Sequence, residues 1–115
     1  MAFTSVTLTH TFVNANGTAA SGSVRFMLNT RMTNGTTSIM PATEVTANLN
    51  GAGALSAVVA ATDDTGTISV GGAFWHVIIA IAGAKTEEYD ISVPHSAPGG
   101  TADLMTLIPS SAQVG

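Results

Sequence analysis

Apolar and polar residues alternate with period two along much of this chain. In residues 4–13, Val6, Leu8 and Phe12 share one parity, and most positions of the other parity are threonine or serine. Successive side chains of a β-strand point to opposite faces, so this spacing predicts a half-buried strand with a threonine-rich outer face. The same alternation recurs in four further segments, residues 23–28, 43–49, 54–60 and 86–93. No segment shows a helical period, so the pattern indicates an all-β protein.

Turn signals separate these segments. Asn-Gly pairs stand at 16–17, 34–35 and 50–51, and both residue types tolerate the positive φ of tight turns. The last pair lies between segments 43–49 and 54–60, which we expect to form a β-hairpin. Residues 73–82 are apolar on both parities, which predicts a central strand buried on both faces.

The closing segment, "TADLMTLIP" (101–109), is expected to be a last strand or a helical turn plus a strand. With it the chain has about seven short strands, with turn signals every 8–12 residues or so, the pattern of an antiparallel β-sandwich. A length of 115 residues fits one domain, and we assign residues 1–115 to it.

Composition excludes several kinds of site and partner. The chain has no cysteine, which rules out disulfides, zinc–thiolate centres and cysteine nucleophiles. Three cationic residues against seven acids cannot build the positive surface that nucleic acids or anionic membranes require. The longest apolar stretch, residues 71–84, is shorter than the roughly 20 residues of a membrane span, and no signal peptide is apparent at the N-terminus. We therefore expect synthesis in a cytoplasm.

The scarcity of charge points to a covered surface. Only 9% of the residues are charged, whereas about a quarter is usual for a free globular domain. Docking on a larger assembly or self-association would explain this composition. Apolar residues on outward parities or in loops are the candidate interface anchors, namely Phe3, Met27, Met32, Met40, Phe74 and Ile78. The alternative is that a second sheet covers them.

No set of polar residues predicts catalysis or a cofactor. His10, His76 and His95 lack the spacing of metal ligands, and Asp63-Asp64 lacks the pattern of a calcium loop. Glu87 and Glu88 are adjacent on a predicted strand and would point to opposite faces, so they cannot act on one substrate. No Gly-x-Ser-x-Gly elbow is present. We therefore expect a protein that is not an enzyme, with no metal and no cofactor.

Three aromatic residues suggest a further possibility. Phe74, Trp75 and Tyr89 could form a sugar-binding platform if their rings were exposed. The alternative is that Trp75 and Tyr89 pack in the core, since both share the inward parity of their strands.

Several motifs together resemble one family. "VNANGTAASGSVRF" is similar to the pattern "dadGtpasGtvtF", which opens small β-domains in virion proteins of bacteriophages that infect actinobacteria. "IMPATEVTANLNGAGALSAVVAATDD", "FWHVIIAIAGAKTEEYDISVP" and "TADLMTLIP" resemble the later strands of that pattern in the same order. The resemblance covers residues 4 to 109 and carries no catalytic residue.

The first half also resembles prealbumin-like and carboxypeptidase-regulatory-like sandwiches. The resemblance implies an Ig-like or prealbumin-like fold, in which the stretch 12–26 is either the first hairpin or a crossing between sheets.

A virion structural protein is the function that the resemblance implies. Because the sequence ends at Gly115, without room for a receptor-binding domain, we expect a capsid decoration protein that cements the shell of the major capsid protein, located on the capsid surface. We expect a homo-oligomer, with a trimer as the first choice. The alternatives are a minor tail, baseplate or fibre component and, in another class, a carbohydrate-binding adhesion module.

Overall fold

The fold is known from a computed structural model that describes residues 3–69, 72–96 and 98–107. Within these residues the chain forms ten strands, one 3-10 turn and one short helix. The elements are β1 (Ser5–Thr11), β2 (Gly22–Leu28), β3 (Met32–Asn34), β4 (Thr37–Ile39), β5 (Glu44–Asn48), β6 (Ala54–Ala60), β7 (Thr67–Ser69), β8 (Trp75–Ile81), β9 (Glu87–Ile91), η1 (Pro98–Gly100), β10 (Thr101–Asp103) and α1 (Leu104–Leu107).

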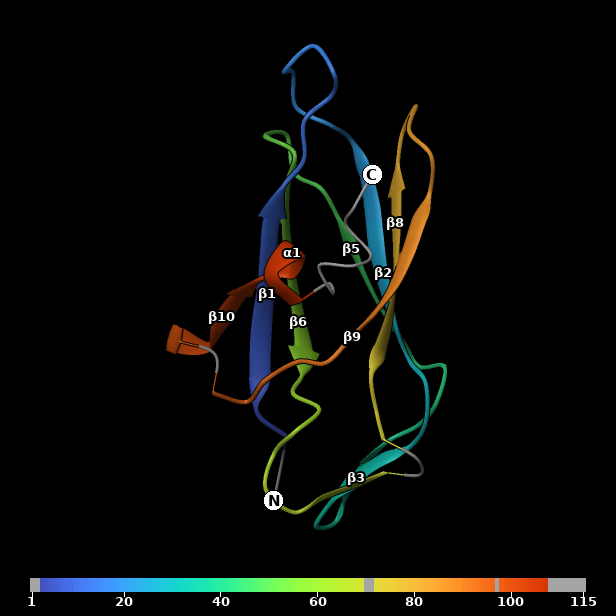
Figure 1. The fold of residues 1–115 in the computed structure, drawn as a ribbon, viewed down its shortest axis with the longest axis vertical. Coiled ribbons are helices and arrows are strands. Elements are labelled where there is room, and N and C mark those ends of the chain that lie inside the picture. The colour runs from blue at the N-terminus through green and yellow to red at the C-terminus, as the bar shows by residue number, and fades with distance from the viewer. Residues whose placement is uncertain (1–2, 70–71, 97, 108–115) are drawn as a thin grey trace.

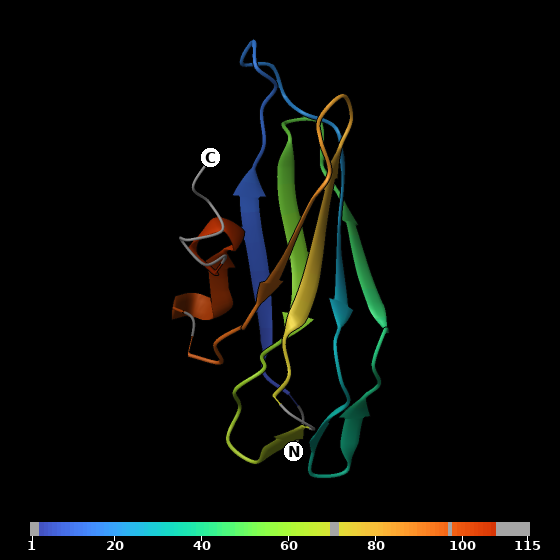
Figure 2. The same cartoon turned by 45° about the vertical axis from the view of Figure 1, so that its right-hand side comes forward.

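The strands form two larger sheets and one small one. One larger sheet has the order β10-β1-β6 and the other the order β5-β2-β8-β9, and they face each other along the long axis of the molecule (Figure 1). The small sheet, β4-β3-β7, lies at the end of the molecule where the chain begins (Figures 1 and 2). Neighbouring strands are antiparallel except for β1 and β10, which run parallel.

The hydrophobic core fills the space between the two larger sheets. Val6 and Leu8 of β1 face Val24 and Phe26 of β2, and all four side chains are fully buried. The residues that the alternation predicts to face inward therefore do so on both sheets. Burying apolar side chains from two sheets against each other is the main term that stabilises such a fold.

The expected single sandwich of about seven strands differs from this arrangement. The structure is rich in antiparallel β-sheet, as predicted, but the described residues contain ten strands in three sheets. The additional elements β3, β4 and β7 have three residues each, and period-two alternation cannot be recognised over so short a run.

The expected hairpin between segments 43–49 and 54–60 is wrong. β5 pairs with β2 and β6 pairs with β1, so the chain crosses from one sheet to the other between them. Asn50 shapes this crossing, because its Oδ1 accepts hydrogen bonds from the backbone N–H groups of Ala52 (2.8 Å) and Ala54 (3.0 Å). An Asn-Gly pair thus signals a reversal of direction without deciding whether the strands on either side share a sheet.

The stretch 12–26 is also a crossing between sheets. β1 and β2 belong to different sheets, and between them only an isolated bridge joins Val13 and Ala19. Of the two arrangements expected for this stretch, the structure therefore selects the crossing over the hairpin.

β8 is central in its sheet, but it is not buried on both faces. β2 and β9 flank it, and Trp75, Val77 and Ile79 point into the core. His76 and Ile78 on its other face remain partly exposed, because no layer of the described structure covers that face. The prediction that this strand is buried on both faces is therefore wrong, because apolar residues on both parities do not show whether a second layer covers the strand.

The closing segment forms a strand followed by a helical turn. β10 pairs with β1, and α1 begins directly after Asp103. The carboxylate of Asp103 caps this turn by accepting the backbone N–H of Met105 at 2.9 Å. Figure 2 shows α1 beside β1, at the side of the molecule away from β5.

Candidate functional site

The outer face of the sheet β5-β2-β8-β9 brings three of the six predicted interface residues together. The strand register places Arg25 of β2 next to Ile78 of β8, and Met27 of β2 next to His76 of β8. Ile78 and Met27 are therefore diagonal neighbours on one face. Phe74 has the parity of Ile78, just before the first residue of β8, so it continues this face toward the small sheet.

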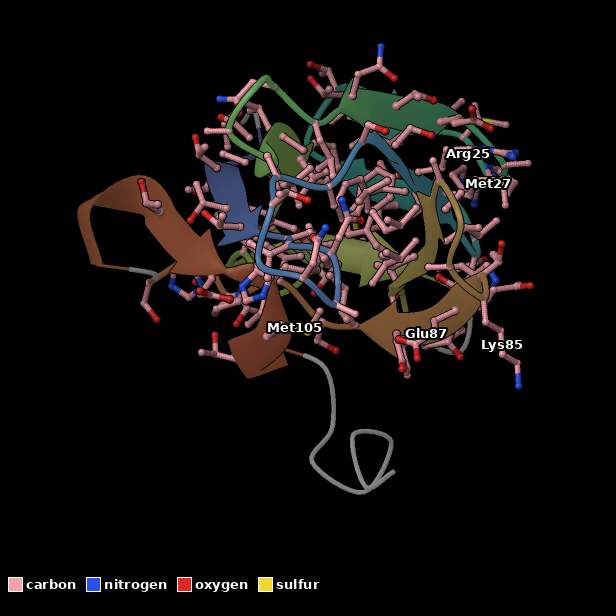
Figure 3. All side chains as sticks on the ribbon, turned by 90° about the horizontal axis from the view of Figure 1, so that it is seen from above. Arg25, Met27, Lys85, Glu87 and Met105 are labelled. Atoms are coloured by element: carbon pink, nitrogen blue, oxygen red, sulfur yellow. The ribbon has the colours of Figure 1, made fainter. Side chains whose placement is uncertain are left out.

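These apolar side chains are only half-buried. Met27, Phe74 and Ile78 all keep part of their surface in contact with solvent, although they lie on or next to central strands. Figure 3 shows Arg25 and Met27 side by side at the margin of the molecule, with their side chains directed away from the core. Polar groups alternate with the apolar side chains on this face: Met27 lies between Glu44 and His76, and Ile78 lies between Arg25 and Glu88.

An ion pair joins β2 and β5 on this face. Arg25 Nη2 lies 3.1 Å from Glu44 Oε2, and Thr46 donates its hydroxyl to Glu44 Oε1 at 2.8 Å. The hydrogen bonds from Thr46 and Arg25 lower the pKa of Glu44, which keeps this carboxylate charged. Arg25 Nε is buried and lacks a hydrogen-bond partner in the described structure.

A histidine of β8 lies between two carboxylates of β9 on the same face. His76 Nδ1 lies 2.8 Å from Asp90 Oδ1, and His76 Nε2 lies 2.7 Å from Glu88 Oε1. The hydrogen bonds to Asp90 and Glu88 raise the pKa of His76. The two carboxylates hold opposite ring nitrogens, so they do not converge on one point. No group of three or more His, Asp or Glu side chains in the described residues could hold a metal ion.

The other three predicted interface residues lie elsewhere. Met32 was expected to be an exposed anchor, but it is fully buried, so that prediction is wrong. It belongs to β3, where it points inward beside Asn34, and this three-residue strand gave no readable parity. Phe3 is half-buried against the core next to β1, and Met40 is 54% exposed directly after β4.

The aromatic platform is not formed. Trp75 is only 3% exposed, and its indole Nε1 donates to the backbone oxygen of Ala60 at 2.9 Å. This bond joins β8 of one sheet to β6 of the other. Tyr89 is half-buried, and its hydroxyl donates to Glu87 Oε1 at 2.7 Å. Core packing, the alternative expected from the strand parity, is correct for Trp75.

A cavity that the sequence did not indicate lies between the sheets, at the end where β8 turns into β9. It has a volume of about 310 Å³ and is lined by Phe12, Val13, Ile79, Ile81, Ala84, Lys85 and Glu87. Its walls come from two segments almost seventy positions apart, so no local motif could reveal it. Figure 3, seen along the long axis, shows the side chain of Lys85 directed away from the molecule at its margin. The cavity is mainly apolar, with one cation and one anion at its rim.

Comparisons with known proteins leave the fold and the site to be interpreted from the molecule itself. No protein-family model, no curated protein and no solved structure matches the chain. Among the described residues no helix has the length and apolar character that crossing a membrane would demand.

Proposed function

We propose that this protein is a non-enzymatic structural component of a bacteriophage virion that decorates the capsid by binding the shell of the major capsid protein. The two larger sheets would then correspond to the Ig-like or prealbumin-like sandwich of the family that the sequence resembles. The observation that carries the proposal is the outer face of β5-β2-β8-β9, where the partly exposed Met27 and Ile78 occupy one diagonal and Arg25 and His76 occupy the other.

This face has the composition of a docking surface. Its apolar side chains would lose contact with water on binding, and the charged groups beside them would fix orientation. A protein that binds only the assembled shell stabilises that shell by mass action, without any chemical step. The low content of charged residues, 9%, agrees with a surface that is covered in the functional state.

Quantitative mass spectrometry of density-purified particles from the source tests the location. The chain offers only three sites to trypsin, after Arg25, Arg31 and Lys85, so a second digestion with chymotrypsin is needed for reliable quantification. A copy number comparable to that of the major capsid protein would support decoration. A handful of copies would favour a tail or baseplate position instead, and absence from the particles would refute the virion role.

A binding assay tests the face. Particles that lack the protein are mixed with the purified chain or with Ile78→Lys, a change that replaces an apolar side chain between Arg25 and Glu88 with a charged one. Ser5→Lys is the matched control, because Ser5 is exposed on the other larger sheet. We expect Ile78→Lys to weaken capture by the particles at least about tenfold and Ser5→Lys to leave it unchanged. Equal capture of both variants would exclude this face as the contact.

A further inference from the structure

β6 leaves one edge of its sheet without a partner. The backbone N–H of Ala61 donates to Thr4 at 2.8 Å, and that of Phe12 donates to Gly53 at 2.9 Å, which fixes the hydrogen-bonded pairs between β1 and β6. In an antiparallel ladder these pairs alternate with pairs whose backbone groups point away. Ser56 and Val58 therefore direct their N–H and C=O groups to the free edge, where no described strand pairs with them.

Hydrogen bonds within the chain already occupy backbone groups at both ends of this edge, so only the middle of β6 has unpaired groups. The N–H of Ala54 donates to Asn50 Oδ1 at 3.0 Å, and the C=O of Ala60 accepts Trp75 Nε1 at 2.9 Å. Between these two ends, the side chain of Val58 is 55% exposed and Ser56 is exposed as well. A short stretch of backbone donors and acceptors is therefore open to another strand.

The β6 edge lacks the features that keep sheet edges apart. Its sequence, ALSAVVA, contains no charged residue, no proline and no glycine. The other edge strands of the two larger sheets differ: β9 carries Glu87, Glu88 and Asp90, β5 begins with Glu44, and β10 has three residues and ends in Asp103. Charges and short length are the usual protection against edge-to-edge pairing. β6 is the long, uncharged edge of the described structure.

We propose that the β6 edge binds the β6 edge of a second copy of this chain, antiparallel and about a twofold axis at Ala57. In this register Ser56 lies opposite Val58 of the other copy, and each such pair exchanges two hydrogen bonds, about four in all. The inner residues Leu55 and Val59 would also lie opposite each other and stay on the core side. The two sheets would become one continuous sheet with the strand order β10-β1-β6-β6-β1-β10.

A second copy fits this edge better than a strand of different chemistry. The edge is uncharged, so self-pairing opposes no like charges, whereas self-pairing of β9 would bring carboxylates together. A twofold contact uses the same surface on both copies and closes on itself, so it gives a dimer in place of the trimer expected from the sequence. The inference is independent of the virion role, because it rests on the β6 edge and not on the outer face of the other sheet.

The test is the mass of the full-length chain in solution, measured by light scattering after size exclusion at concentrations up to about 100 µM. Ser56→Pro removes an N–H group that faces the free edge and leaves the bonds between β6 and β1 in place. Val58→Lys is the second edge variant, since it puts a positive charge on each copy next to the axis. Thr46→Pro on the free edge of β5 and Thr7→Lys beside Val58 on the central strand are the matched controls.

We expect the wild type and both controls to have twice the chain mass of 11.5 kDa. In both edge variants we expect the dimer dissociation constant to rise about a hundredfold, because each copy loses edge hydrogen bonds or gains a like charge. Circular dichroism shows whether each variant is folded. A wild type that stays monomeric at the highest concentration would overturn the proposal, as would a dimer that persists in both folded edge variants. A monomer that captures another protein through β6 would also overturn it, because the occupant would not be a second copy.

Discussion

His95 binds Asp63 through two of its nitrogen atoms. Its backbone N–H donates to Asp63 Oδ1 at 2.7 Å, and its ring Nδ1 lies 2.9 Å from the same oxygen. The neighbouring Asp64 accepts the backbone N–H and the hydroxyl of Thr4, each at 2.7 Å. The two adjacent carboxylates thus fasten the loop after β6 to the segment after β9 and to the residue before β1.

The pairs that His95 and His76 form with carboxylates predict that the protein is most stable in mildly acidic solution. The hydrogen bond to Asp63 raises the pKa of His95 above its ordinary value of 6.5, and hydrogen bonds to Asp90 and Glu88 raise that of His76. A raised histidine pKa stabilises the fold fully below 6.5, and the gain is lost as pH rises through the folded pKa. We expect the free energy of unfolding, measured with urea, to be higher at about pH 5.5 than at about pH 8.5.

Asp63 contributes to the acidic limit of that window, together with Glu44, whose pKa is also lowered. Partial burial raises the pKa of the Asp63 carboxyl, but the hydrogen bonds from His95 outweigh this, and the pKa lies below its ordinary value of 3.8. A lowered carboxyl pKa stabilises the fold above 3.8, and the gain is lost as pH falls through the folded pKa.

Histidine variants test the pH dependence of stability. His95→Gln should reduce this dependence and leave the part of it that His76 contributes. If the double variant His95→Gln, His76→Gln keeps the full dependence, the assignment is wrong.

Gly53 is required where the chain crosses between the sheets. Its φ is +77°, and a Cβ atom there would lie 2.2 Å from the backbone oxygen of Phe12, which accepts the N–H of Ala20. We expect Gly53→Ala to lower the free energy of unfolding by about 2–4 kcal/mol, because backbone must move to admit the methyl group. Gly51→Ala is the control. Gly51 has open space around it and no positive φ, so denaturation should show a change within about 0.5 kcal/mol.

The indole of Trp75 connects the two larger sheets. Trp75→Phe removes the hydrogen bond to Ala60 and leaves a void in a site that is only 3% exposed. We expect the free energy of unfolding to fall by about 1–3 kcal/mol, measured by circular dichroism because the chain has no other tryptophan. Phe12→Leu, which changes a half-buried ring against the same core, should cost less. If Trp75→Phe leaves the free energy of unfolding unchanged, the hydrogen bond to Ala60 adds nothing to stability.

The sequence predicts inner faces well and strand partners poorly. Val6, Val24 and Val59 lie in the core as their parity requires, because alternation reports directly which side of a strand is buried. Pairing is a different matter. Asn50 makes the same local turn whether the chain reverses within a sheet or crosses to the next, and the deciding contacts come from β1 and β2.

Residues that meet across long separations in the chain were also beyond prediction. His10 lies 3.0 Å from Asp103, and His76 lies between Asp90 and Glu88, so two of the histidines that lack ligand spacing still find carboxylates on other strands. Met27 and Ile78 could be placed on outward parities from the sequence. Their position as diagonal neighbours could not be predicted, because it depends on the register of β2 against β8.

The turn before β5 holds a residue in an unfavourable backbone conformation. Ala42 has a φ of 65°, and it is the non-glycine residue of the described structure with a positive φ. Its N–H donates to the oxygen of Leu28 at 2.9 Å, which fixes the turn against the end of β2. Left-handed backbone costs an alanine about 1–2 kcal/mol, whereas glycine adopts it without that penalty.

Ala42→Gly should therefore stabilise the protein. The added freedom of glycine in the unfolded chain costs about 0.4–1 kcal/mol, so the expected net gain in the free energy of unfolding is about 0.5 kcal/mol. Ala52→Gly is the matched control, because Ala52 is also exposed in a turn but has no positive φ. Urea denaturation should show a small loss there, since only the entropic cost remains. If both variants lose stability equally, the positive φ of Ala42 carries no strain.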